Sequence, residues 1–310
     1  MLKNNDKIDI NDLEINPLLQ QLRENPITGN GENHYFTSFD GAKIFYRVWR
    51  PIIKINKILI VSHGMGGHGE FFVLLADKVF NEGIMVIAPD YRNHGHSDGK
   101  KGDLKRFNYI LQDLHEFINY ISEQYPDTPI YLLGESMGGA VNINYVAEYP
   151  ENLTGMILFS PAVKIEFSLK RRILLILIAL PLLILRIFAP SSSIIGARGS
   201  EDEGIRNPIH QQYDKTDPNH LKKISARYLI QLLKYIRKSV SKASKINIPT
   251  VIFQGTSDVE VSQEGVSKFF ERLNSDMKEL YLIEGGYHCL LTDPDFQDKW
   301  HILIEWLKKH

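Results

Sequence analysis

The chain has 310 residues, long enough for one large domain or two smaller ones. Its 43% hydrophobic and 24% charged residues are ordinary for a globular protein, and a net charge of −1 gives no reason to expect a nucleic-acid partner. The single cysteine, Cys289, excludes an internal disulfide and suits a reducing compartment. No continuous apolar stretch opens the chain, so no signal peptide is predicted and a cytoplasmic location is expected.

Residues 1–33 are polar and read as an N-terminal extension with, at most, a short docking helix. Strand-like and helix-like stretches then alternate, which predicts a mostly parallel sheet with helices on both faces. Asp40-Gly41 is a hairpin signal between the first two strands. The predicted helix covers 107–125, and the predicted strands are 34–39, 42–49, 57–62, 84–89, 130–133, 153–161, 250–255 and 279–285. In such sheets, functional side chains gather at the carboxyl ends of the strands.

A Gly-x-Ser-x-Gly pattern, Gly134 to Gly138, follows the short apolar run 130–133 and precedes a helical stretch. A strand–turn–helix elbow holds its serine in a strained turn, so the residues two positions away must be small. The pattern alone recurs by chance, but this context predicts that Ser136 is a nucleophile.

Two further candidates follow later strands. Asp258 comes just after 250–255, and His288 comes just after 279–285. A serine nucleophile needs a base to accept its proton, and the base needs a carboxylate to fix its tautomer. Taken singly, Asp258 reads as a turn residue and His288 as a loop histidine. Their order after Ser136 predicts the triad Ser136, Asp258, His288.

The loop His63-Gly64-Met65-Gly66-Gly67 ends another predicted strand. A tetrahedral intermediate needs preorganised donors for its oxyanion. We expect these to be the backbone N–H groups of Met65 and Met137, the latter directly after the serine. The alternative for the loop is a flexible glycine turn.

Taken in order, HGMGGHGEF, DYRNHGHSDG, GESMGGA, GTSD and GYH resemble the signatures of the monoglyceride lipase and lysophospholipase group of α/β-hydrolases. The resemblance covers roughly 35–162 and 245–310. It implies an eight-stranded α/β-hydrolase sheet with an inserted cap, and it assigns the same roles to the triad and the two methionines. The chain departs from the group at Glu135, where histidine is more usual, and at Asn93, where glycine is common.

Cofactors and metals are not predicted. The chain has neither a Walker pattern nor Gly-x-Gly-x-x-Gly, so no nucleotide cofactor is implied. His63, His68, His94 and His96 lie on two loops without the spacing of zinc ligands. Cys289 adjoins the candidate base and is expected to pack as a small apolar side chain.

From 163 to 245 the strand–helix rhythm stops, which predicts an inserted cap between core segments 34–162 and 246–310. Residues 173–185 are an apolar run of thirteen that is too short to span a bilayer as a helix and is interrupted by Pro181. Basic residues flank it, and the insertion holds 16 lysines and arginines against 6 acidic residues. We therefore expect the cap, through 170–186 and 222–245, to contact a membrane surface peripherally.

The function expected from these features is hydrolysis of long-chain acyl esters, such as monoacylglycerol or lysophospholipid, through an acyl-enzyme. An exopeptidase or amidase would use the same triad, and an acyltransferase would pass the acyl group to an alcohol. A ligand-binding member of the fold without hydrolytic activity would not need a complete set of nucleophile, acid and base.

Overall fold

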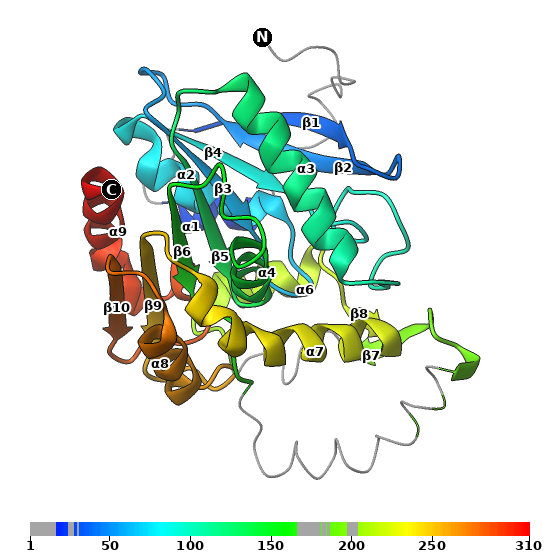
Figure 1. Cartoon of the computed structure of the whole chain (residues 1–310). Coiled ribbons are helices and arrows are strands. Elements are labelled where there is room, and N and C mark those ends of the chain that lie inside the picture. Colours follow the sequence, from blue (N-terminus) through cyan, green and yellow to red (C-terminus); the bar gives the residue numbers. More distant parts are fainter. Residues whose placement is uncertain are drawn as a thin grey trace.

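An eight-stranded sheet forms the centre of the protein (Figure 1). The structure, a computed structural model, describes residues 17–23, 28–29, 31–165, 181, 184, 187–196 and 204–310. The strand order is β1-β2-β4-β3-β5-β6-β9-β10. The strands are β1 (Glu32–Thr37), β2 (Lys43–Trp49), β3 (Lys57–Ser62), β4 (Ile84–Pro89), β5 (Ile130–Glu135), β6 (Gly155–Phe159), β9 (Thr250–Gly255) and β10 (Lys278–Ile283).

The pairing is that of an α/β-hydrolase sheet, as the sequence predicted. β2 pairs antiparallel with both β1 and β4, and every other neighbouring pair is parallel. The hairpin between β1 and β2 turns at Asp40-Gly41, where Gly41 has φ of 86°. A positive φ is easy for glycine because it has no Cβ.

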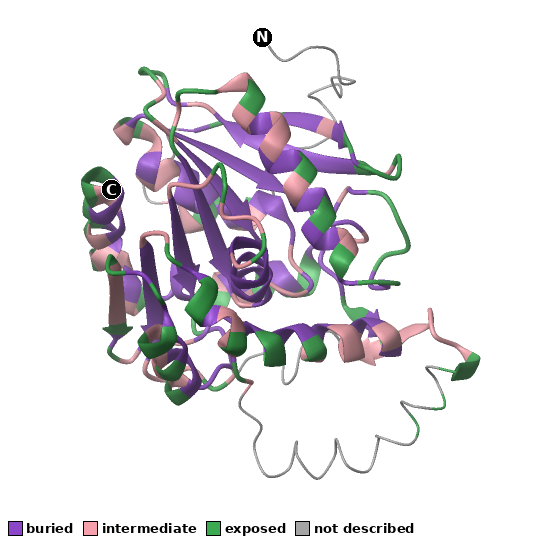
Figure 2. Cartoon of the chain, in the orientation of Figure 1, coloured by how far each residue is buried: buried purple, intermediate pink, exposed green. Residues whose placement is uncertain are grey.

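Helices cover both faces of the sheet. They are α1 (Pro17–Leu22), α2 (Val73–Val79), α3 (Asn108–Gln124), α4 (Met137–Val146), α6 (Pro208–Thr216), α7 (Ala226–Lys242), α8 (Gln263–Arg272) and α9 (Trp300–Lys309). Side chains alternate along β3, so Ile58 and Ile60 join the core beneath α3, α4, α7 and α8. Leu59 and Val61 join the opposite core, beneath α2 and α9. The central strands are buried at every position except Lys57 at the start of β3, so the sheet is a rigid platform for the loops at its ends (Figure 2).

The segment between β6 and β9 contains α6, α7 and a small antiparallel pair, β7 (Ser193–Gly196) with β8 (Lys223–Ser225). In Figure 1 the arrow of β10 points toward the end of the molecule where α7, β7 and β8 lie. The Ser225 hydroxyl caps α7 by accepting a hydrogen bond from the N–H of Tyr228 at 3.2 Å. Tyr228, Leu232 and Ile236 recur at helical spacing and are buried in the core that α4 also enters, so α7 is firmly packed.

The apolar run 173–185 lies outside the described residues, apart from positions 181 and 184. Among the helices that the structure describes, none combines the length and apolar character needed to cross a bilayer. The exposed apolar side chains nearest the run in sequence are Ile187 and Phe188, with 63% and 82% of their surface accessible.

Candidate active site

Ser136 lies at the turn between β5 and α4 with φ of 52° and ψ of −115°. A non-glycine residue in this region costs on the order of 1–3 kcal/mol, and the surrounding packing must hold it there. A Cβ on Gly138 would lie 1.9 Å from the carbonyl oxygen of Ser62, and one on Gly134 would lie 2.6 Å from that of Gly138. Both neighbours therefore have to be glycine, which is the reason for the Gly-x-Ser-x-Gly pattern.

Backbone hydrogen bonds hold the serine turn in place. The N–H of Ser136 donates to the carbonyl of Phe159 at 3.0 Å. The carbonyl of Ser136 accepts from the N–H groups of Ala140 and Ala162, at 3.2 and 2.9 Å. The strained turn is thus tied to both α4 and the loop after β6, and the Oγ atom has a fixed position.

The structure brings the three predicted side chains into one hydrogen-bonded line. His288 Nε2 lies 2.8 Å from Ser136 Oγ, and His288 Nδ1 lies 2.9 Å from Asp258 Oδ2. The three residues follow three different strands, and Ser136 and His288 are 152 positions apart in the sequence. The loops of Asp258 and His288 are also joined directly, since Ser257 N–H donates to the carbonyl of Gly286 at 2.9 Å.

Asp258 is held by donors on both carboxylate oxygens. Oδ1 accepts from the backbone N–H groups of Glu260 and Val261, at 2.8 and 2.9 Å. Oδ2 accepts from Gln254 Nε2 at 3.0 Å as well as from His288. Burial by itself would raise the pKa of Asp258, but His288 and these donors together lower it, so the group is a carboxylate at neutral pH.

Glu260 is a functional candidate that was not among the residues predicted from the sequence. Its Oε2 lies 3.7 Å from His288 Nε2, on the side of the ring that faces Ser136. Burial alone would lower the pKa of His288, but the charges of Asp258, Glu260 and Glu135 outweigh it and raise the pKa to about 9. In the sequence, only the closeness of Glu260 to Asp258 could have indicated this role.

This raised pKa makes a prediction about pH. A general base must be neutral, so kcat/KM should rise with pH up to about 9 rather than level off above the reference value of ~6.5. Glu260→Gln removes one negative charge that favours protonated His288. The midpoint of the rising part of the kcat/KM profile should therefore shift to lower pH by roughly 0.5–1 unit. The measurement is the pH dependence of kcat/KM on a soluble ester.

Glu264→Gln is the matched control for that profile. Glu264 is an exposed carboxylate on α8 that pairs with Lys164 and Lys268 and loses the same single charge. Its profile should coincide with that of the parent. A midpoint that stays in place in Glu260→Gln, or that moves equally in both variants, would contradict the role given to Glu260.

The predicted oxyanion loop lies beside the serine. A Cβ on Gly64 would lie 3.6 Å from the Cβ of Ser136, so Met65 is the next residue along this close approach. Met137 is the first residue of α4, where first-turn N–H groups have no acceptor within the helix. The two backbone segments proposed to donate to an oxyanion thus flank Ser136.

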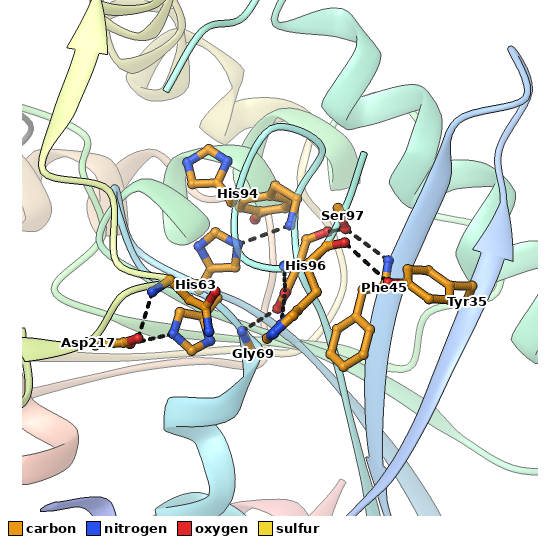
Figure 3. A network of polar contacts seen from close by, with 12 residues as sticks. Tyr35, Phe45, His63, Gly69, His94, His96, Ser97 and Asp217 are labelled. Atoms are coloured by element: carbon orange, nitrogen blue, oxygen red, sulfur yellow. Dashed lines mark hydrogen bonds and ion pairs between the residues drawn. The ribbon is translucent and has the colours of Figure 1, made fainter. Parts of the chain in front are cut away.

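The histidine that begins this loop and the one that follows it, His63 and His68, have structural roles (Figure 3). His63 Nδ1 lies 2.8 Å from the carbonyl oxygen of Gly64, and Nε2 accepts from the N–H of Tyr91 at 3.0 Å. That pairing needs a neutral ring, in agreement with a pKa that burial lowers to about 3. His68 instead pairs with Asp217 at 2.6 Å and ties the loop to the segment between β6 and β9.

Asp90 organises the next loop in the same network (Figure 3). The buried carboxylate accepts from the N–H groups of Gly69 and His96, at 2.7 and 2.8 Å. Asn93, where glycine is common in the resembled group, has φ of 67°. Asparagine tolerates this left-handed conformation, and the Asn93 side chain also donates to the carbonyl of Lys100 at 2.9 Å. The departure is therefore compatible with the same loop shape.

A small cavity of about 40 Å³ adjoins the predicted oxyanion loop, and both aromatic and ionisable side chains line it. Its lining includes Glu135 from the serine turn and four residues from the segment after β6, namely His210, Tyr213, Asp214 and His220. His220 Nδ1 and His210 Nε2 lie 3.3 and 3.6 Å from Asp214 Oδ1. This cluster was not among the predicted site residues, although His210 and Asp214 have the spacing of neighbours on one helix face.

Comparison with known proteins gives consistent results. The family model described as serine aminopeptidase, S33, matches residues 53–295. A monoglyceride lipase homolog of Monkeypox virus is 30% identical over 259 residues, which are 83% of this chain and 91% of that protein. The monoglyceride lipase of Rattus norvegicus is 29% identical over 259 residues, 83% of each chain. A soluble variant of the Saccharomyces cerevisiae monoglyceride lipase, solved with a substrate analog, has a TM-score of 0.80 at 23% identity, over 92% of this chain and 97% of that one.

Proposed function

We propose that this member of the serine aminopeptidase S33 family of α/β-hydrolases acts on long-chain monoacyl esters, monoacylglycerol above all. Within that family the chain belongs to the monoglyceride lipase group, and it is therefore a carboxylic ester hydrolase of lipids. The observation that carries the hydrolytic chemistry is the hydrogen-bonded line from Ser136 through His288 to Asp258, at 2.8 and 2.9 Å. This geometry allows proton transfer without rearrangement of the site.

The proposed reaction passes through an acyl-enzyme. Ser136 Oγ attacks the ester carbonyl carbon while its proton moves to His288 Nε2, and the N–H groups of Met65 and Met137 stabilise the oxyanion. As the C–O bond to the alcohol breaks, His288 returns the proton to the departing oxygen. Water then attacks the acyl-Ser136 ester by the same route, releasing the fatty acid and regenerating the serine. Asp258 keeps the imidazole in one tautomer throughout.

The ionisable side chains in the small cavity support a substrate whose alcohol portion is small and bears hydroxyl groups. Its 40 Å³ is room for about three water-sized groups, and carboxylates and imidazoles offer both acceptors and donors to hydroxyls. Asp214 and His220 would contact the alcohol side of the ester, because the cavity borders Gly64 and Met65. Two further acyl chains would not fit there, which favours monoacyl over triacyl substrates.

A substrate panel tests this proposal. Matched long-chain mono-, di- and triacylglycerols and a lysophosphatidylcholine are compared by fatty acid release under saturating detergent. We expect kcat/KM for monoacylglycerol to exceed that for triacylglycerol by roughly tenfold or more. Each additional acyl chain that does not fit the site should cost about 1–3 kcal/mol or more of transition-state binding free energy. Faster release from aminoacyl anilides would favour an exopeptidase, and transfer of the acyl group to added glycerol would favour an acyltransferase.

We also propose that 163–245 act as a cap over the core formed by 34–162 and 246–310, with 1–33 as an extension, and that the cap binds membranes peripherally. The apolar run 173–185 and its basic flanks supply interfacial contact. Lys234, Arg237 and Lys238 lie exposed along α7. Each such cation adds up to ~1 kcal/mol of attraction to an anionic surface.

The membrane contact makes its own prediction. A variant carrying Leu175→Asp, Leu177→Asp and Leu182→Asp should lose most of its binding to liposomes in co-sedimentation, because three charges would have to enter the interface. It should still hydrolyse a short soluble ester, since the triad is not altered. Binding equal to that of the parent would mean that the anchor lies elsewhere in the chain.

A further inference from the structure

A second, larger hollow lies between the core and the start of α7, and it belongs to neither the triad nor the cavity beside it. Its volume is about 440 Å³, and three of its lining residues are cationic. Lys105 comes from the loop before α3, while Arg227 and Lys234 come from α7. Ile230, Gln231 and Pro190 complete the lining.

Hydrogen bonds keep two of its walls fixed. Gln231 Oε1 accepts from the N–H of Phe107 at 3.1 Å, and Gln231 Nε2 donates to the carbonyl of Lys105. This amide clamps the Lys105 loop to α7. On the other side, Arg227 pairs through two nitrogens with Asp103, with Nε 2.7 Å from Oδ1. The hollow is therefore a built feature rather than a gap between loosely held side chains.

Among the residues that the structure describes, only one of the three cations of this hollow has an ionic partner. Asp103 balances Arg227, and its low exposure keeps it committed to that pair. Neither Lys105 nor Lys234 forms an ion pair in the portion of the chain that the structure describes. The two lysines and the part of Arg227 not bonded to Asp103 line one hollow, and they are the kind of donors that the oxygens of a phosphate group accept from.

We propose that this hollow binds the phosphate group of an anionic phospholipid in the membrane on which the enzyme works. The inference deepens the proposed membrane contact of the cap and rests on it. A lipid is favoured over free phosphate because Pro190, in the lining, follows Phe188 by two residues, a distance of about 7 Å at most. Phe188 and Ile187 are strongly exposed, so a phosphate held here lies within reach of a bilayer that these side chains enter.

The site also has a consequence for orientation. Diffuse attraction between a basic helix and an anionic surface lets the protein approach in many orientations. A phosphate seated in the hollow, together with Phe188 in the interface, fixes two points of contact on the same side as α7. This arrangement would hold the segment after β6 against the lipid surface.

The test compares two double variants that remove the same charge. Lys105→Gln/Lys234→Gln alters the hollow, whereas Arg237→Gln/Lys238→Gln alters two exposed cations on the same helix that do not line it. Vesicles of phosphatidylcholine with and without phosphatidylglycerol are used in co-sedimentation with full-length protein. We expect the hollow variant to lose at least roughly tenfold more affinity for the anionic vesicles than the control variant, because direct ionic hydrogen bonds exceed diffuse attraction.

Other outcomes would overturn the proposal. Equal losses in the two variants would mean that only diffuse charge matters, and no loss in the hollow variant would mean that the hollow does not meet lipid. Displacement of the parent protein by millimolar inorganic phosphate, but not by equal ionic strength of chloride, would show a site for free phosphate instead. Turnover of a short soluble ester and the thermal unfolding midpoint are measured in parallel, so a failure of the proposed hydrolysis or of folding is seen separately.

Discussion

Replacing Ser136 with alanine should lower kcat by about a millionfold, because the acyl-enzyme route then has no nucleophile. The fold should persist. Alanine lacks the hydroxyl but keeps the Cβ, and the backbone hydrogen bonds of residue 136 to Phe159, Ala140 and Ala162 do not involve the side chain. A fluorophosphonate probe, which reacts with an activated serine, should label the parent and leave the variant unlabelled.

Ser257→Ala is a suitable control for this experiment. Ser257 lies in the loop that carries Asp258, and the contact that joins this loop to Gly286 uses its backbone N–H rather than its hydroxyl. Labelling and turnover of this variant should match those of the parent. If Ser136→Ala retained labelling, or Ser257→Ala lost it, Ser136 could not be the nucleophile.

Local patterns were enough to predict the fold and to bring three distant residues together. Buried strands in parallel sheets are short apolar runs, and their loops meet at one edge, so Ser136, Asp258 and His288 could be paired from chain order alone. The glycines around Ser136 were equally informative, because their need for space is a property of the backbone turn. Each of these signals is contained within a few consecutive residues.

The surroundings of the triad could not be predicted in the same way. Glu260 reaches His288 because the turn after Asp258 directs it there and because Gly204 leaves room, since a Cβ on Gly204 would lie 2.0 Å from Glu260 Oε1. That contact joins a residue of the segment after β6 to a core loop 56 positions later. Asp214 and His220 line the cavity through a similar long-range contact. The N–H of Leu221, next to His220, donates to the carbonyl of Gly66 at 2.8 Å and holds this segment beside the loop. Tertiary packing between distant segments sets these positions.

Packing also changes the interpretation of α7. From sequence, 222–245 was expected only to contact a membrane surface through its basic residues. The structure buries Tyr228, Leu232 and Ile236 against the core while Lys234 stays exposed. Helical periodicity allows both at once, because residues three or four apart share a face. The charged face is thus presented by a helix that the core holds rigidly.

The second large effect is expected for Asp258→Asn, which should lower kcat by about 10⁴-fold, as in serine proteases. The carboxylate accepts on both oxygens, from His288 Nδ1 among others. An asparagine amide directed at Nδ1 would donate instead of accept, and the ring would then carry its proton on Nε2. That nitrogen lies 2.8 Å from Ser136 Oγ and could no longer accept the serine proton.

Gln254→Leu provides the graded comparison for Asp258→Asn. Gln254 Nε2 donates to Asp258 Oδ2 at 3.0 Å, so its loss weakens the support of the carboxylate without changing the tautomer. We expect a fall of about tenfold, in line with one hydrogen bond to a charged group at 1.5–3 kcal/mol partly replaced by water. Rates of acyl-enzyme formation, followed by a burst of released alcohol, separate the two effects, because only the tautomer change should abolish the burst. A burst that survives in Asp258→Asn with normal amplitude and rate would mean that the carboxylate does not set the state of His288, and the base would then depend on Glu260 alone.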